Sequence, residues 1–546
     1  DRPHSQHYHE SRLIMTSGHP GIYTTLTDTT LARFAKALPA VRGLTPGTLA
    51  RHPLRLHDTQ SCIAREYGFA SWADLRTHVE ISRLRSSDPD ALATAFLDLV
   101  YSSDIAGGMT RSRPHLAARL LEEHPNLVRH DPWIACAAGD VGTVRATLAG
   151  DPDWVNRQGG KLDLTPLIAT THSSLLTLGD HGERLRTIVS LLLDAGADPN
   201  RCIERTWQLS SRIPAETWQV SALHGAAGVN HDPALTGRLL AAGADPNDGE
   251  SLYHSLDNPV CTPLLLEAGA TVTGTNALMR CLDFDDIDTF RLLLAHAGES
   301  EELSDGRVLL HAIRRRRSRA HVEAILAAGA DPSARSGDGV SARIQAVRNG
   351  LTEVAELLGK ADGDTRVSEK DAFLSACAQA DESAAREILS RRADLPASLD
   401  PVRLKLLPEL AEAGCAEAVK LMVDLGWPID VAGGDWSASA LNHAVFQGNA
   451  SLADHLLAHG ASWHARHAFG DDVCGTLSWA SVNRPRDDGD WVGCAQVLRA
   501  HGLARALRDP AHPECVLLEG RRRLFDEDVS ALLLGEARDD APLPPQ

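Results

Sequence analysis

Apolar residues along the chain recur in short runs that fit helices, and many of these runs end in the same way. The stretch 191–200, LLLDAGADPN, carries an apolar helix end that leads into a Gly-Ala-Asp-Pro turn. Similar stretches follow at 239–248 (LLAAGADPND), 325–334 (ILAAGADPSA) and 456–465 (LLAHGASWHA). Glycine readily takes the left-handed conformation that stops a helix, and the Asp-Pro pair then directs the chain into an extended turn. The pattern therefore predicts a chain of repeated short helices.

The distance between successive turn glycines gives the length of one repeat. It is 34 residues from Gly426 to Gly460, but 47 from Gly196 to Gly243, so one interval is enlarged. The period is close to 33 residues and holds two helices, the first rich in small residues, as in ALHGAAG at 222–228. Two short helices cannot bury their apolar faces alone, so successive units must stack.

These units resemble ankyrin repeats. The segments that carry the resemblance are TPLIA at 165–169, SALHGAA at 221–227, VEAILAAGADPS at 322–333 and LADHLLAHGA at 452–461. The resemblance extends from about Leu92 to Gly502 and covers roughly twelve units, several of them degenerate. It implies an all-α solenoid of helix-turn-helix repeats, in which the first helices and the extended turn tips line a concave groove.

The chain divides by this criterion into three regions. Residues 1–90 do not repeat, and 55–80 reads as two amphipathic helices hinged at Gly68, with Ser71 as the N-cap of the second. This region resembles the helical flank of bacterial ankyrin-repeat proteins, and we expect it to cover the open apolar end of the stack. The array itself spans 91–505. We expect 506–546 to hold a C-terminal cap and a disordered, Pro-rich tail.

Charge and composition narrow the classes of partner. The chain has 73 acidic residues against 54 Lys and Arg, a formal net charge of −19, which repels a phosphate backbone and argues against nucleic-acid binding. Its ten cysteines stand singly, as reduced thiols do in a cytoplasmic protein. No apolar run approaches the ~18 residues that a membrane span needs, so we expect no membrane partner.

The sequence lacks the common signatures of catalytic, cofactor and metal sites. It contains no GxSxG, Walker, GxGxxG or HExxH motif and no His and Cys pairs at zinc spacing. His4, His7 and His9 form a small cluster that we interpret as a solvated tail. His224 fills the usual TPLH histidine slot of ankyrin repeats, and the resemblance implies a structural role for it. We expect no metal and no cofactor, and the balance favours a protein that is not an enzyme.

Binding residues are expected where the repeat pattern is broken. The enlarged interval carries Trp207 and Trp218 on its turn tip, where they would either bind a partner or pack under their own loop. Arg314 and Arg315, together with Arg348 in the next unit, would form a basic patch on the groove side. Such a patch would bind a carboxylate or phosphate, or would be a solvated charge run balanced by nearby acidic residues.

A third candidate region lies late in the array. Trp436 and Trp463 fall on consecutive turn tips, one repeat apart, with Phe446 between them and His464 and Asp471 close by. Aromatic walls beside a carboxylate would hold a basic peptide or a cationic ligand. Two further tryptophans of this region are expected to pack between repeats: Trp427 and Trp479.

The leading hypothesis from the sequence is a non-enzymatic scaffold that binds a protein or peptide in its groove. An ordered solenoid loses little conformational entropy on binding, and its tip residues set specificity. The alternative is a cofactor-independent enzyme or small-molecule binder, in which Asp and His side chains act as acid and base in a pocket near Trp207 and Trp218. A deep closed pocket with two convergent titratable residues would favour the alternative, and an open groove would favour the scaffold.

Overall fold

The computed structural model describes residues 28–535, with short gaps at 38–44, 46–47, 49–55, 70–71, 73, 76, 80–88, 108–111, 130, 208–215, 299, 363–365, 485–488 and 513–514. The contacts within the chain divide it into two compact units. The first unit comprises 1–84, 444–458 and 472–546, and the second comprises 85–443 and 459–471.

The second unit is built mainly of short α-helices. Those of its first half are α6 (Pro89–Val100), α7 (Ser103–Ala106), α8 (Pro114–Glu123), α9 (Pro132–Ala138), α10 (Val141–Gly150), α11 (Pro166–Thr171), α12 (Gly179–Asp194), α13 (Ala222–His224), α14 (Pro233–Ala241), α15 (Ser251–Ser255) and α16 (Thr262–Glu267). Three 3-10 helices, η2 (Pro125–Arg129), η3 (Pro152–Asn156) and η4 (Ser174–Thr177), and one π-helical turn, η5 (Gly225–Val229), lie between them.

The helices of the second half continue the same alternation. They are α17 (Ala277–Cys281), α18 (Ile287–Ala297), α19 (Glu301–Ser304), α20 (Arg307–Arg314), α21 (Arg319–Ala327), α22 (Ala342–Arg348), α23 (Thr352–Asp362), α24 (Glu369–Ala378), α25 (Glu382–Arg391), α26 (Pro401–Leu404), α27 (Leu406–Glu412) and α28 (Ala416–Asp424). The next helix, α29 (Ala440–Phe446), begins in the second unit.

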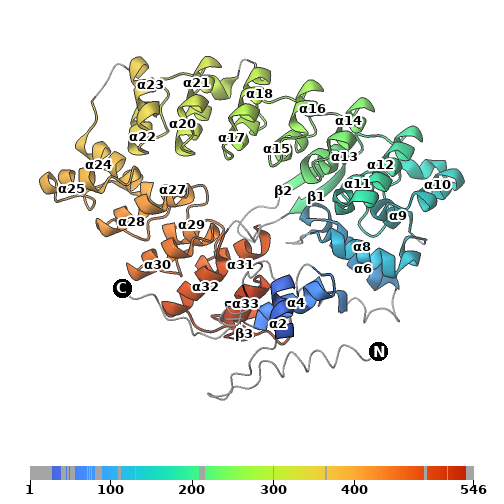
Figure 1. Ribbon diagram of the computed structural model, residues 1–546. Coiled ribbons are helices and arrows are strands. Elements are labelled where there is room, and N and C mark those ends of the chain that lie inside the picture. The colour runs from blue at the N-terminus through green and yellow to red at the C-terminus, as the bar shows by residue number, and fades with distance from the viewer. Residues whose placement is uncertain are drawn as a thin grey trace, which may run out of the picture. The chain divides into compact units, whose positions relative to one another are not determined.

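Successive helix pairs pack side by side. The first helix of a pair contacts the first helix of the next, as α20 contacts α22, and the second helices do the same, as α18 contacts α21. Figure 1 shows the pairs from α15–α16 to α22–α23 standing next to one another. Leu and Ala side chains fill the contacts, among them Leu239 and Leu293, both fully buried. The prediction of a mostly helical chain is confirmed.

The GADPN turns are used to join neighbouring pairs. The glycine of each turn has a left-handed backbone, with φ of +92° at Gly196 and +90° at Gly243. The Asn200 side chain donates to the carbonyl of Gly243 at 2.8 Å and accepts from the amide of Asp245 at 2.7 Å. Asn156, at the end of η3, makes the same two bonds to the turn at Gly196. Its side chain donates to the carbonyl of Gly196 and accepts from the amide of Asp198. The asparagine of one turn therefore satisfies the backbone of the next, which is a physical reason for its recurrence.

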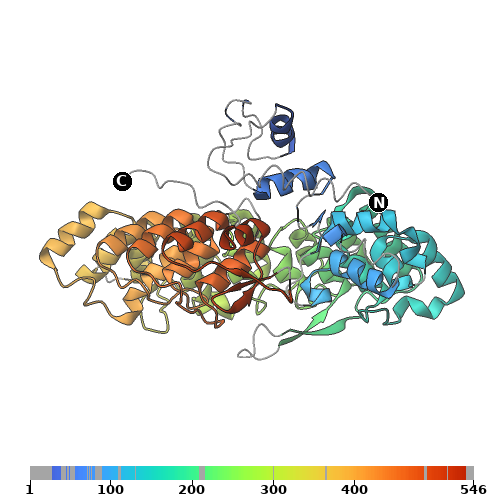
Figure 2. The same ribbon diagram turned by 90° about the horizontal axis from the view of Figure 1, so that it is seen from below.

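The enlarged interval after Gly196 forms a β-hairpin. Strand β1 (Ile203–Trp207) pairs antiparallel with β2 (Glu216–Val220), and Arg205 lies opposite Trp218 in the register. Figure 2 shows the two strands projecting from the helical pairs of this unit. The enlarged interval that the sequence predicted is present. Because it forms paired strands, the prediction of an all-α chain does not hold here.

The first unit combines both ends of the chain. Its helices are α2 (Asp28–Ala37), α4 (Leu56–Glu66), α30 (Ala450–Ala458), α31 (Val473–Asn483), α32 (Trp491–Ala500) and α33 (Glu527–Leu533). The strands β3 (Leu507–Arg508), β4 (Val516–Leu518) and β5 (Arg521–Arg523) form an antiparallel sheet that was not predicted. Beside it, α33 packs against α32.

The expected hinge of the N-terminal region is confirmed in part. The segment after α4 turns at Gly68, which has a left-handed backbone with φ of +81°. Ser71, the His4, His7 and His9 cluster and the Pro-rich tail all lie outside the described residues. Among the residues that the structure describes, no helix has the length and apolar character needed to cross a membrane.

Candidate functional site

Two turn tips of the second unit bring aromatic and imidazole rings together. The indole of Trp436 lies edge-on to His443, with ring centres 4.8 Å apart, and edge-on to His467 at 5.0 Å. The ring of Phe469 follows, 5.8 Å from that of His467. We call Trp436, His443, His467 and Phe469 the tip cluster.

Backbone hydrogen bonds hold the two tips of this cluster. Gly433 and Ala438 exchange both of their amide–carbonyl bonds, at 3.0 and 2.9 Å, which closes the first tip around Trp436. The amide of Ala468 donates to the carbonyl of Trp436 at 2.9 Å and so joins the second tip to the first. The cluster therefore rests on bonded backbone and does not depend on ring contacts alone.

His443 supports the cluster from below. It lies on α29, is almost fully buried, and its Nε2 is 3.2 Å from the carbonyl oxygen of Gly433. Burial lowers the pKa of His443 to about 4, so the ring is neutral at physiological pH and donates this hydrogen bond. The other members reach the surface, since Trp436 and His467 are half-buried and Phe469 is 44% exposed.

The remaining aromatic candidates lie in other surroundings. Trp463 is half-buried against the ring of His464, with centres 5.5 Å apart, and its Nε1 is buried without a hydrogen-bond partner. In the first unit, Phe446 stacks on Trp479 with centres 5.6 Å apart, and the guanidinium of Arg484 lies 4.9 Å from the centre of the Phe446 ring. The tip cluster thus contains Trp436, but its other members are rings that the sequence analysis did not select.

Exposure separates the two tryptophans that were expected to pack between repeats. Trp427 is buried, as expected, and its Nε1 donates to the carbonyl of Leu404 at 3.1 Å. For Trp479 the expectation is wrong, because its side chain is 41% exposed. The sequence pattern does not distinguish a ring that fills a gap between helices from one that lies on a neighbouring ring.

The predicted arginines of α20 reach the first tip beside Trp436. Arg314 and Arg315 each hydrogen-bond to one carboxylate oxygen of Asp435. The Nε of Arg315 also lies 2.7 Å from a carboxylate oxygen of Asp283, and Glu412 accepts from the amide of Asp435 at 3.1 Å. We call Asp283, Arg314, Arg315, Glu412 and Asp435 the ionic cluster. Both arginines have carboxylate partners within the chain, so an incoming anion would have to compete with Asp435.

The carboxyl groups in the ionic cluster and beside it include one whose pKa is lowered, Asp435, and one whose pKa is raised, Glu409. Burial would raise the pKa of Asp435, but the charges of Arg314 and Arg315 outweigh it and lower that pKa. Glu409, on the same helix as Glu412, behaves oppositely. Burial raises the pKa of Glu409 to about 7, against the attraction of Arg314 and with a smaller contribution from Glu412.

This shift predicts a stability that falls with rising pH. Folded Glu409 holds its proton more tightly than the unfolded chain, whose carboxyl titrates near 4.5, so stability declines between about pH 4.5 and 7. Glu409→Gln should therefore raise the free energy of unfolding at pH 8 by about 2 kcal/mol and change it little at pH 5. Urea unfolding at both pH values measures this difference. Glu417→Gln, at an exposed position on α28, is the matched control and should show no such pH dependence.

Arg348 belongs to a different set of interactions. Its Nε donates to Asp371 at 2.7 Å, and Arg403 donates to the same carboxylate oxygen at 3.1 Å. The three predicted arginines therefore do not form one patch, because Arg348 is held in its own ion pair.

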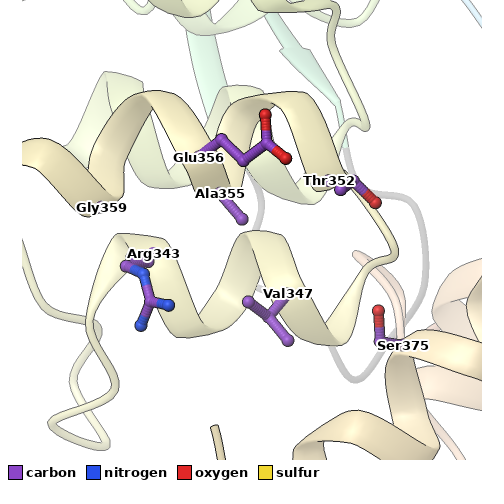
Figure 3. Close-up of a pocket in the computed structure, with 7 residues that line it drawn as sticks. All are labelled: Arg343, Val347, Thr352, Ala355, Glu356, Gly359 and Ser375. Atoms are coloured by element: carbon purple, nitrogen blue, oxygen red, sulfur yellow. The ribbon is translucent and has the colours of Figure 1, made fainter. Parts of the chain in front are cut away.

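A shallow cavity of about 360 Å³ lies among α22, α23 and α24. Figure 3 shows its lining residues, which are Arg343, Val347, Thr352, Ala355, Glu356, Gly359 and Ser375. The guanidinium of Arg343 and the carboxylate of Glu356 point away from each other in this view. This cavity is not the pocket near Trp207 and Trp218 that the enzyme alternative predicts, so it does not test that alternative.

The remaining candidates can be placed in part. Trp218 is half-buried on β2, and the neighbouring Arg205 donates to the carbonyl of Leu162 at 2.6 Å. The side chain of Trp207 lies outside the described residues. The carbonyl of Asp471 accepts from the amide of His467 at 3.1 Å, so Asp471 closes the second tip through its backbone.

Two residues that complete the site were not selected from the sequence. Asp435 belongs to the ionic cluster and directly precedes Trp436 of the tip cluster. Phe469 is the most exposed ring of the tip cluster. The position of Asp435 beside Trp436 on a turn tip was a usable signal. Its pairing with Arg314 was not, because 121 residues separate the two.

Comparisons with known proteins add little to this geometry. No family model matches the chain, and no curated protein matches it. Among solved structures, the chain is similar to the human ASB11 ankyrin repeat domain, at 16% sequence identity and a TM-score of 0.21. That likeness covers 41% of this chain and 96% of the other. A similarity of this size says nothing about what the present chain binds.

Proposed function

We propose that this chain is a non-enzymatic recognition scaffold of the bacterial ankyrin-repeat type, binding a protein or peptide through the groove and turn tips of a solenoid of roughly twelve units. The repeated helix pairs and the asparagine bond from one GADPN turn to the next support the repeat architecture. The observation that carries the binding role is the tip cluster, because it presents aromatic rings to solvent on two turns that are bonded to each other.

The tip cluster has the chemistry of a binding hot spot. Tryptophan is enriched at such positions, and rings held by a fixed backbone lose little conformational entropy when a partner binds. Trp436 is half-buried, so its orientation is set, while Phe469 leaves 44% of its surface free for contact. The cluster therefore suits an apolar side chain of a partner.

The carboxyl groups beside the cluster favour a partner segment that also carries positive charge. Glu412 lies next to Asp435, and Arg314 and Arg315 are already paired with that aspartate. A Lys or Arg side chain of the partner would meet carboxylates there and could lie on the aromatic faces. The proposed partner is a peptide segment with an apolar anchor flanked by basic residues.

Peptide selection on the full-length chain tests this proposal. A displayed random-peptide library should yield ligands rich in apolar and basic residues, and Trp436→Ala combined with Phe469→Ala should weaken their binding at least tenfold. Helical content by circular dichroism should stay unchanged. The matched control is Trp479→Ala, which removes an equally exposed ring from the other unit and should leave binding intact. Loss of binding in the control alone would move the site to the stacked Phe446 and Trp479 pair.

A further inference from the structure

Three potential metal ligands converge in the second unit, far from the tip cluster in the sequence. Asp104 lies on α7, His172 follows the last residue of α11, and His224 is the last residue of α13. Each offers one ligand atom, and the three atoms lie within 4.8 Å of one another. Oδ2 of Asp104 and Nδ1 of His172 are 3.0 Å apart. This spacing is already close to that of two ligands on a single ion with bonds of about 2.0–2.2 Å.

The groups behind these ligand atoms are arranged as in a metal site. The second ring nitrogen of His172, Nε2, lies 3.0 Å from the carbonyl oxygen of Ser221. The second carboxylate oxygen of Asp104 accepts from the hydroxyl of Ser102 at 2.5 Å. Metal-binding histidines typically donate their other N–H to a carbonyl or carboxylate, and ligating carboxylates are themselves hydrogen-bonded. These contacts orient both side chains toward the same point.

His224 provides the independent observation. Its side chain is 95% buried, since only 5% is exposed, and its Nδ1 has no hydrogen-bond partner. Leaving a buried polar atom unsatisfied is costly, and such atoms are rare. Its ring lies edge-on to His172, with centres 5.5 Å apart.

We propose that Asp104, His172 and His224 bind one divalent transition-metal ion of the zinc type. Two imidazole nitrogens and one carboxylate oxygen suit zinc and its neighbours in the first transition row, whereas magnesium and calcium prefer oxygen ligands alone. The two ring nitrogens of His172 face oxygen atoms, Oδ2 of Asp104 and the carbonyl oxygen of Ser221. The ion would replace the contact between Nδ1 of His172 and Oδ2 of Asp104, and each of these atoms would bond to the metal instead.

The ion would link α7, α11 and α13, three elements of the second unit that other helices separate along the chain. Such a link binds the folded chain and not the unfolded one, so it stabilises the fold by mass action. The inference is independent of the recognition role, since it uses none of the tip cluster.

Metal titration of the full-length chain tests the site. After removal of metal with a chelator, we expect one Zn²⁺ to bind with a Kd below about 10 μM and to raise the melting temperature. Asp104→Asn and His224→Gln should each abolish that binding. The matched control is His254→Gln, whose ring centre lies 5.0 Å from that of His224 but which is not one of the three ligands. A second control replaces His4, His7 and His9 together, and both controls should retain the ion.

Two measurements on the unsubstituted chain remain decisive even if a variant does not fold. Calorimetry should show one zinc ion bound per chain. X-ray absorption of the zinc-loaded chain should show two imidazoles and a carboxylate oxygen on the metal. Binding that persists in Asp104→Asn and His224→Gln, or that disappears only in the substituted His4, His7 and His9 chain, would overturn the proposal. Absence of any zinc binding at this affinity would do the same.

Discussion

Asp371→Ala is expected to lower the free energy of unfolding by about 3 kcal/mol. Asp371 is only 5% exposed and accepts hydrogen bonds from three side chains: Ser368 at 2.6 Å, Arg348 at 2.7 Å and Arg403 at 3.1 Å. Its removal leaves the guanidinium of Arg348, only 12% exposed, without a carboxylate. Arg403 retains Asp400 at 2.6 Å, which limits the loss.

The pH dependence of this effect has a definite sign. Burial would raise the pKa of Asp371, but Ser368, Arg348 and Arg403 together lower it. A carboxyl with a lowered folded pKa contributes stability above the unfolded value, near 4, and loses it as the pH falls through the folded value. The difference between Asp371→Ala and the unsubstituted chain should therefore be full at pH 7 and shrink below pH 4.

Urea unfolding followed by circular dichroism measures both expectations. Asp394→Ala is the matched control, because this exposed aspartate makes a two-point ion pair with Arg392, with both N–O distances at 2.8 Å. Exposed pairs contribute little, so this variant should unfold almost like the unsubstituted chain. Equal destabilisation of the two variants would show that the burial of Asp371 is not what makes it important.

Local features of the fold could be predicted from the sequence because each depends on neighbouring residues. A glycine after Leu-Leu predicts the left-handed turn seen at Gly243, and the hinge at Gly68 follows from the same chemistry. The hairpin of β1 and β2 was visible only as excess length, since its pairing depends on register rather than on composition. The sheet of β3 to β5 was missed because its strands have only two or three residues.

The sites were less predictable because they depend on contacts between distant parts of the chain. The sequence showed Arg314 and Trp436 as separate features, and only the fold places Asp435 between them. Asp104, His172 and His224 follow no metal-binding spacing, since 68 residues separate the first two. His224 occupied a slot with an expected structural role, and its unpartnered Nδ1 is visible only in three dimensions. Spacing motifs detect sites whose residues lie on one element. The site around Trp436 and the proposed metal site each combine residues from several elements.

Gly225→Ala should destabilise the second unit by roughly 1–3 kcal/mol, although alanine favours helices. Gly225 begins the π-helical turn η5, directly after His224. A Cβ placed on it would lie 2.4 Å from Cδ2 of His172 and 2.8 Å from the backbone carbon of Thr171. The imidazole of His172 is fixed by Asp104 and Ser221, and the backbone of Thr171 has no rotamer to change, so neither can move away cheaply.

Gly237→Ala, on α14 of the same unit, provides a control with the opposite sign. No atom lies within 4 Å of a Cβ built there, so the substitution should gain the helix propensity of alanine, about 0.5–1 kcal/mol. Thermal unfolding measures both variants. The melting temperature should fall in Gly225→Ala and rise in Gly237→Ala. If Gly225→Ala also stabilises, His172 can move, and the geometry that aligns it with Asp104 is not rigid. Because that alignment also underlies the proposed metal site, zinc affinity should fall in Gly225→Ala and stay unchanged in Gly237→Ala.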